Sequence, residues 1–196
     1  MDTVKDIVIY GAKKGTDKKQ YAFKDMNGNY CEKNFNEVFY DATGLGQHLY
    51  ALGLRGKKVA ILSENSYYWI AAFYSIATGK MTAIPLDPKL PNDDLTDLMV
   101  RSSCDAIYYT NDFSSAIEMM KTNPEVKLTE YLKLEDFDKL VEAGHTEMDS
   151  GTDNYLDDEV NPDDLGFIVY TSGTTGKSKG VMLTQKNVAS NAIATC

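Results

Sequence analysis

The sequence is poor in cysteine, and its three cysteines lie far apart. They are Cys31, Cys104 and Cys196, and no Cys-x-x-Cys pair occurs. An odd number of widely spaced cysteines argues against a disulfide framework and against a structural zinc site. We therefore expect reduced thiols and a cytoplasmic protein.

Long hydrophobic runs are also missing. The most apolar window, YYWIAAFYSIATG at residues 67–79, is shorter than the roughly 18 apolar residues that a transmembrane helix needs. We interpret it as a buried helix. The first ten residues carry two acidic side chains and no long apolar core, so they do not resemble a secretory signal.

Positive charge is scarce, since the formal net charge is −9. Residues 130–164 contain 13 acidic side chains against Lys133 and Lys139, which gives this segment a net charge of −11. The rest of the chain is therefore close to neutral. A net-acidic chain without a basic stripe is a poor candidate for binding nucleic acid.

Apolar runs alternate with helical patterns along the first half of the chain. This alternation is typical of βαβ units in an α/β fold, with a largely parallel sheet flanked by helices. Ahead of it, Asn27-Gly28 predicts a β-hairpin. The expected elements, in chain order, are a helix capped by Asn34, a strand at 57–63, a helix at 67–78, a strand at 81–87, a helix capped by Asn92, and a strand at 105–110.

The segment YTSGTTGKSKG, residues 170–180, contains the most informative motif. Gly176-Lys177-Ser178 matches the end of a Walker A loop, but Thr171 stands where that motif needs its first glycine. A Walker A loop also leads directly into a helix, whereas GVMLT at 180–184 reads as a strand. The loop therefore joins two predicted strands, and Thr184 is the expected N-cap of a later helix.

The composition of this loop still suits phosphate binding. Glycines let backbone N–H groups approach a polyanion, hydroxyl groups donate hydrogen bonds, and lysines add positive charge. An ordinary flexible turn is the alternative. The ordered combination of glycine, hydroxyl and lysine residues between two strands favours phosphate binding.

These residues carry a family resemblance. YTSGTTGKSKGVMLT, residues 170–184, resembles the AMP-binding signature of the adenylate-forming superfamily, which includes acyl-CoA synthetases, peptide-synthetase adenylation domains, aryl-CoA ligases and luciferases. Residues 34–110 resemble the family in the order of their elements and in the sequence PLDP at 85–88. Two positions depart from the pattern: Ser178 replaces a common proline, and Gln185 replaces a common histidine and leaves its effect on substrate choice open.

The resemblance implies ATP-dependent activation of a carboxylic acid as acyl-AMP, followed by transfer to a thiol such as coenzyme A. ATP, Mg²⁺ and coenzyme A are the expected small molecules. The resemblance assigns no catalytic residue or metal ligand to this chain. It places the β- and γ-phosphates on a loop of eight residues: Thr171, Ser172, Gly173, Thr174, Thr175, Gly176, Lys177 and Lys179, with Lys179 as the preferred charge donor.

We expect residues 1–196 to be a partial N-terminal AMP-binding domain. Its parts are a hairpin and βαβ region at about 20–110, an acidic connector at about 146–164, and the phosphate-loop hairpin with the start of a helix at 165–196. The family's adenine, magnesium and acyl sites and its C-terminal domain are expected beyond residue 196. The isolated chain should therefore be inactive and need the remaining part of the same protein.

Two other functions stay open. Within the family, the sequence of residues 169–191 looks more like that of fatty-acyl-CoA synthetases. Amino-acid or aryl-acid adenylation is the alternative. A different class of function is a non-catalytic, truncated module that binds a nucleotide or a partner.

Other residues that invite a functional reading are better explained by structure. His48 is expected to be a structural histidine, and Cys104 a small core residue. The aromatic side chains at 67–74 should pack in the core, and the acidic run Asp157-Asp158-Glu159 should face solvent.

Overall fold

The computed structural model describes residues 1–15, 17–151, 154–171 and 178–195. Within these ranges the chain forms a two-stranded hairpin and a six-stranded sheet in the order β6-β5-β3-β4-β7-β8. The strands are β1 Lys19–Lys24, β2 Tyr30–Asn34, β3 Lys58–Leu62, β4 Thr82–Pro85, β5 Ala106–Tyr109, β6 Glu130–Lys133, β7 Leu165–Thr171 and β8 Lys179–Thr184. The helices are α1 Val4–Lys14, α2 Phe35–Ala51, α3 Tyr67–Ala77, α4 Asn92–Ser102, α5 Ser114–Thr122, α6 Phe137–Asp149 and α7 Gln185–Ala194.

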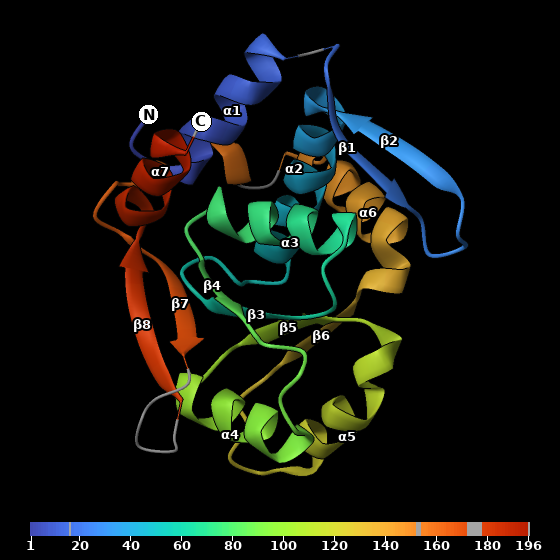
Figure 1. The fold of residues 1–196 in the computed structure, drawn as a ribbon, viewed down its shortest axis with the longest axis vertical. Coiled ribbons are helices and arrows are strands. Elements are labelled where there is room, and N and C mark those ends of the chain that lie inside the picture. The colour runs from blue at the N-terminus through green and yellow to red at the C-terminus, as the bar shows by residue number, and fades with distance from the viewer. Residues whose placement is uncertain (16, 152–153, 172–177, 196) are drawn as a thin grey trace.

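The large sheet is parallel except at one edge. Strands β3 to β7 run in one direction, and β8 pairs antiparallel with β7. Helices α2, α3 and α6 cover one face, and α4 and α5 cover the other (Figure 1). The predicted α/β fold with a largely parallel sheet is therefore confirmed.

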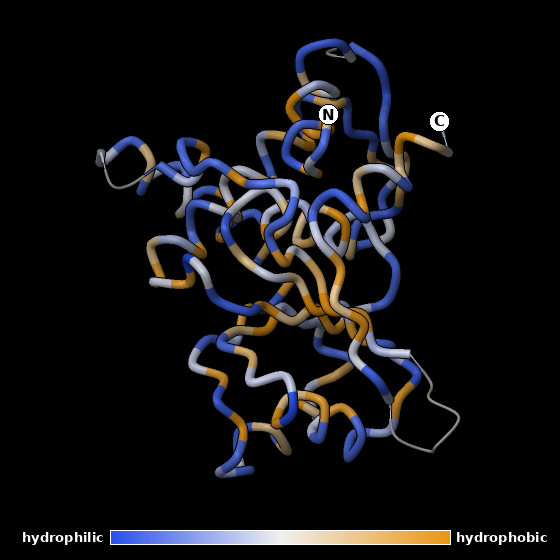
Figure 2. Tube along the Cα trace, turned by 90° about the vertical axis from the view of Figure 1, so that its left-hand side faces the viewer, coloured by the Kyte–Doolittle hydropathy of each residue, from blue (hydrophilic) through white to orange (hydrophobic). Residues whose placement is uncertain are grey.

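Alternate residues of the central strand supply the two cores. Val59 and Ile61 of β3 pack toward α2 and α3, whereas Ala60 and Leu62 pack toward α4 and α5. All four are completely buried, as expected for a parallel sheet that is covered on both faces. The strands accordingly form the hydrophobic centre of the molecule (Figure 2).

Local sequence signals predicted several element boundaries correctly. Asn34 caps α2, and its side chain accepts a hydrogen bond from the backbone N–H of Glu37. Thr184 caps α7 in the same way through Asn187. Gly28 adopts a φ of 85° in the turn between β1 and β2, a conformation that glycine reaches without steric cost.

Other local expectations were wrong or incomplete. Asn92 is the first residue of α4 and not its cap, and its side-chain amide donates to the hydroxyl of Ser115 at 3.0 Å. Helix α1 and strand β6 were not predicted from the sequence. A capping box between Thr3 and Asp6 begins α1, and this Thr-x-x-Asp spacing was the available signal.

The described residues of the acidic connector form more secondary structure and are more buried than expected. Helix α6 extends to Asp149, and a short 3₁₀ helix follows at Tyr155–Asp157. The side chain of Tyr155 is completely buried. Its hydroxyl donates to the carbonyl of Ser75 at 2.8 Å, and its backbone N–H donates to the side chain of Gln47 at 2.9 Å. The connector is thereby fixed against α2 and α3 just before β7 begins.

Candidate functional site

The β7–β8 hairpin presents the predicted phosphate loop at the carboxyl end of the sheet. Phe167 of β7 pairs in parallel with Ala83 of β4, which fixes the direction of β7. Across the hairpin, Thr171 pairs with Lys179. Thr171 and Lys179 are therefore the last described pair of the ladder, and residues 172–178 join them in the sequence.

The structure brings together the two outer members of the predicted phosphate site. Thr171 and Lys179 are opposite each other and exposed. The other predicted members, Ser172, Gly173, Thr174, Thr175, Gly176 and Lys177, lie outside the described residues. The prediction that the loop joins two strands, with the helix beginning only after Thr184, is confirmed by the bounds of β8 and α7.

Residues 170–171 and 178–180 flank the loop on its two sides and are called its stems below. The two stems pack closely against each other. Tyr170 pairs across the hairpin with Gly180, where a Cβ atom would lie 3.2 Å from a carbon of the Tyr170 ring. The absence of a side chain at Gly180 thus leaves room for this ring. Burial raises the pKa of the Tyr170 hydroxyl above its ordinary value, although nearby Arg101 opposes that effect. The ring therefore packs as a neutral side chain at the base of the loop.

Gln185 occupies the opposite end of the hairpin. Its side chain is buried, and the residue is only 1% exposed. Its amide oxygen accepts from the backbone N–H of Val4 at 3.1 Å, while its amide nitrogen donates to the carbonyl of Ala77 at 2.9 Å. Gln185 therefore joins α1 and the end of α3 to the base of β8.

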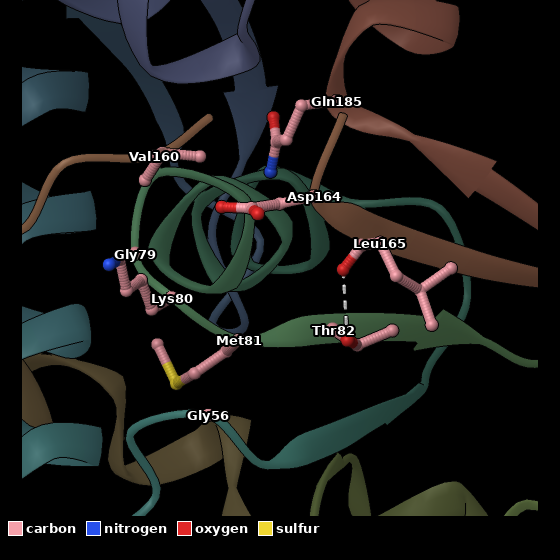
Figure 3. A pocket seen from close by; sticks show the side chains of 9 residues that line it. All are labelled: Gly56, Gly79, Lys80, Met81, Thr82, Val160, Asp164, Leu165 and Gln185. Carbon is pink, nitrogen blue, oxygen red and sulfur yellow. Dashed lines mark hydrogen bonds between the residues drawn. The ribbon is translucent and has the colours of Figure 1, made fainter. Parts of the chain in front are cut away.

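A cavity of about 280 Å³ lies beside Gln185 (Figure 3). It opens where β4 and β7 begin, and the hydroxyl of Thr82 donates to the carbonyl of Leu165 at 3.1 Å along its wall. Its lining residues are Gly56, Gly79, Lys80, Met81, Thr82, Val160, Asp164, Leu165 and Gln185. Because the loop leaves from the other end of β7, this cavity and the phosphate loop are at opposite ends of the hairpin.

A second cavity, of about 360 Å³, lies at the carboxyl ends of β3 and β5. The chain passes from β3 to β4 on one side and returns to β5 on the other, and ligands of open α/β sheets bind at such switch points. Among its described lining residues are Glu64, Asp112 and Glu135, with no lysine or arginine. Carboxylates repel phosphate, so a polyphosphate is better accommodated at the lysine-bearing loop.

His48, Cys104 and the aromatic side chains at 67–74 have structural roles, as expected. Nδ1 of His48 lies 3.4 Å from a carboxylate oxygen of Glu147, between α2 and α6. Cys104 is completely buried, and burial raises the pKa of its thiol to about 11. The aromatic side chains of α3 pack against the core, including a stacked pair between Phe73 and Phe167.

The prediction that Asp158 faces solvent was wrong. Its side chain is 11% exposed, and it forms an ion pair with Arg55 and accepts from the hydroxyl of Tyr50 at 2.6 Å. Burial tends to raise the pKa of this carboxyl group. The hydrogen bonds from Tyr50 and Arg55 outweigh burial and hold the pKa below its ordinary value.

Over the described ranges, no group of three or more His, Cys, Asp and Glu side chains is placed to hold a metal ion. No helix in the same ranges combines the length and the apolar character needed to cross a bilayer.

Comparison with known proteins identifies one family. A family model described as "AMP-binding enzyme" matches residues 11–196. The nonribosomal peptide synthetase tcpP of Claviceps purpurea is 31% identical over 133 residues, which cover 68% of this chain and 6% of that protein. Long-chain-fatty-acid–CoA ligase 5 of Rattus norvegicus is 28% identical over 191 residues, covering 88% of this chain and 28% of the ligase.

Solved structures share the fold. The fatty acyl CoA synthetase of Mycobacterium tuberculosis superposes with a TM-score of 0.81 at 21% identity, covering 100% of this chain and 37% of that chain. ATP-bound MatB of Rhodopseudomonas palustris gives a TM-score of 0.72 at 22% identity, covering 96% and 36%. The chain thus spans well under half the length of these relatives.

Proposed function

The chain belongs to the AMP-binding enzyme family, and from this premise we propose that the protein containing it activates a carboxylic acid with ATP. A carboxylate oxygen attacks the α-phosphorus, and the bond from that phosphorus to the pyrophosphate leaving group breaks. The resulting acyl-AMP then reacts with a thiol, whose sulfur attacks the carbonyl carbon while AMP leaves. Coenzyme A is the proposed thiol, and a fatty acid the proposed substrate.

The observation that carries this proposal is the hairpin closed by Thr171 and Lys179. This pair lies at the carboxyl end of the sheet, and the sequence that joins its two residues is rich in glycine, hydroxyl and lysine residues. Backbone N–H groups and hydroxyls of residues 171–177 are proposed to surround the β- and γ-phosphates. Lys179 is proposed to neutralise their charge, which lowers the barrier as charge accumulates on pyrophosphate.

Magnesium is expected to enter with the nucleotide. Mg²⁺ is commonly held by substrate phosphates together with one or two carboxylates. When bound, it supplies electrophilic assistance at the phosphates. The adenine, magnesium and acyl sites, together with a C-terminal domain, are proposed to belong to the remaining part of the protein.

The identity of the acid has two candidates. Similarity to the rat long-chain-fatty-acid–CoA ligase over 88% of this chain supports a fatty acid. Similarity to the peptide synthetase of Claviceps purpurea, at 31% identity, supports amino-acid adenylation instead. The choice depends on the acyl pocket, so activity measurements must decide between them.

ATP–pyrophosphate exchange by the full-length protein tests the proposal. Fatty, aryl and amino acids are supplied in turn, and exchange that depends on one class of acid identifies the substrate class. We expect Lys179→Ala to reduce exchange by about ten- to a hundredfold, the loss typical of one hydrogen bond to a charged group. Lys186→Ala, which removes another exposed lysine at the start of α7, should leave exchange unchanged.

Two results would contradict the proposal. A folded full-length protein that binds ATP yet exchanges pyrophosphate with no acid would be a non-catalytic nucleotide-binding module. Equal exchange by wild type and Lys179→Ala would remove Lys179 from the phosphate site.

A further inference from the structure

Arg101, near the end of α4, contacts both stems of the phosphate loop. One terminal nitrogen of its guanidinium donates to the carbonyl of Ser178 at 2.5 Å. The guanidinium carbon also lies 5.7 Å from the centroid of the Tyr170 ring. Tyr170 directly precedes Thr171, and Ser178 directly precedes Lys179. The side chain of Arg101 therefore contacts residues on both sides of the loop, from α4, which lies next to the β7–β8 hairpin in Figure 1.

The guanidinium is held in place from several sides. Its other terminal nitrogen donates to Asp97, one helical turn earlier in α4, at 3.2 Å. The Tyr170 ring, which lies next to the guanidinium, also lies close to Gly180, whose missing side chain leaves the ring its space. The planar, multi-donor guanidinium of arginine suits this combination of stacking and hydrogen bonding, which a lysine could satisfy only in part.

The same position also brings a positive charge to the base of the loop. The Arg101 side chain remains 34% exposed, and its partner Asp97 is 51% exposed. A carboxylate this exposed only partly offsets the arginine charge, because solvent screens the pair. The base of the loop therefore carries the positive charge of Arg101 in addition to that of Lys179.

We propose that Arg101 is a positioning residue for the phosphate loop, which fixes the separation of its two stems and adds positive charge where a nucleoside triphosphate binds. The inference rests on the proposed function, since it assigns the triphosphate to this loop. Arg101 acts through Tyr170 and Ser178 and is assigned no contact with the reacting atoms.

The test compares Arg101→Ala, Arg101→Lys and Lys121→Ala in the full-length protein by ATP–pyrophosphate exchange. Lys121 is a matched control, because it also pairs with a carboxylate one turn away and lies over a tyrosine ring, at 2.8 Å and 5.3 Å. It does so next to β6, at the opposite edge of the sheet. We expect Arg101→Ala to raise the KM for ATP about tenfold, as for one charge-assisted hydrogen bond.

The pattern of the constants separates positioning from simple stabilisation. The KM for the carboxylic acid should stay unchanged in Arg101→Ala, and Arg101→Lys should recover part of the ATP affinity. Lys121→Ala should keep the KM for ATP of the wild type. An Arg101→Ala protein with an unchanged KM for ATP, or with equal losses for ATP and acid, would overturn the inference.

Tripolyphosphate binding distinguishes failure of this inference from failure of the proposed function. If the wild type shows no acid-dependent exchange, the proposed function fails, and calorimetric titration with tripolyphosphate then tests Arg101 alone. Weaker binding by Arg101→Ala than by Lys121→Ala supports the positioning role. Equal binding by the two variants, or no binding by the wild type, contradicts it.

Discussion

The environment of Asp158 differs from the one that its acidic neighbours in the sequence predict. It belongs to an acidic segment that suggests a solvated connector, yet its carboxylate accepts hydrogen bonds from Tyr50 and Arg55. In addition, the ammonium group of Lys5 donates to the carbonyl oxygens of Leu156 and Asp158 at 2.7 and 2.6 Å. The connector is therefore fastened to both α1 and α2.

We predict that Asp158→Asn destabilises the protein by about 1–2 kcal/mol at pH 7, because charge-assisted hydrogen bonds are lost. The pKa of this carboxyl group is lowered in the folded state. Its stabilising contribution is therefore present above the unfolded pKa of about 3.9 and is lost as pH falls through the folded pKa. Urea unfolding at pH 7 and at a series of acidic pH values measures both effects.

The neighbouring acid provides the control. Asp157 is exposed, so Asp157→Asn should leave the free energy of unfolding at pH 7 within experimental error. A wild type and Asp158→Asn that differ equally at pH 7 and at the lowest pH would contradict the role assigned to the ionised carboxylate.

At the scale of secondary-structure elements, the contact between α2 and α6 depends on two glycines. A Cβ atom at Gly144 would lie 1.8 Å from the carbonyl oxygen of Gly44 and 3.0 Å from the backbone nitrogen of His48. Backbone therefore meets backbone at this crossing. Gly44 weakens α2 as an isolated helix, but it permits the close approach of α6.

We predict that Gly144→Ala lowers the free energy of unfolding by about 3 kcal/mol, since the helices must separate to admit the methyl group. Helix propensity alone would predict a gain of about 1 kcal/mol, so the sign of the change discriminates between the two effects. For a chain of this size the loss corresponds to a fall in Tm of about 6–12 °C. Thermal unfolding followed by circular dichroism measures it.

Glu142→Ala is the matched control, because this exposed residue lies on the same helix. Its effect should stay within about 0.5 kcal/mol. A Gly144→Ala protein as stable as the wild type would show that α2 and α6 do not pack as closely as described.

Elements with strong local signals could be predicted from the sequence, whereas long-range contacts could not. Apolar runs and caps such as Asn34 and Thr184 located most strands and helices. The anchoring of Tyr155 on Ser75 spans 80 residues, and the contact of Arg101 with Ser178 spans 77. Such contacts depend on how the strands are ordered in the sheet, and no local pattern encodes that order.

The β7–β8 hairpin likewise combines features that local sequence predicts with long-range contacts that it does not. The sequence of the phosphate loop and its position between two strands were readable, because both follow from residues 165–184 alone. The role of Gln185 was not, since its partners Val4 and Ala77 come from distant parts of the chain. Gln185 is a buried link between elements, and it lies at the end of the hairpin opposite the phosphate loop.

At the scale of the whole molecule, two regions of different chemistry lie along the carboxyl end of the sheet. The acidic cavity at the ends of β3 and β5 disfavours polyphosphate, while Arg101 of α4 and Lys179 of β8 bring positive charge to the carboxyl end of the β7–β8 hairpin. This distribution of charge is the reason for proposing that ATP binds at the β7–β8 hairpin.

The most direct test of the central claim follows one oxygen atom. A carboxylic acid that supports pyrophosphate exchange is labelled with ¹⁸O in its carboxylate and incubated with ATP, Mg²⁺, coenzyme A and the full-length protein, and the nucleotide products are analysed by mass spectrometry. If the carboxylate attacks the α-phosphorus and the thiol then displaces AMP from the carbonyl carbon, each AMP carries one ¹⁸O. Unlabelled AMP, or ADP in place of AMP, would contradict acyl-adenylate formation.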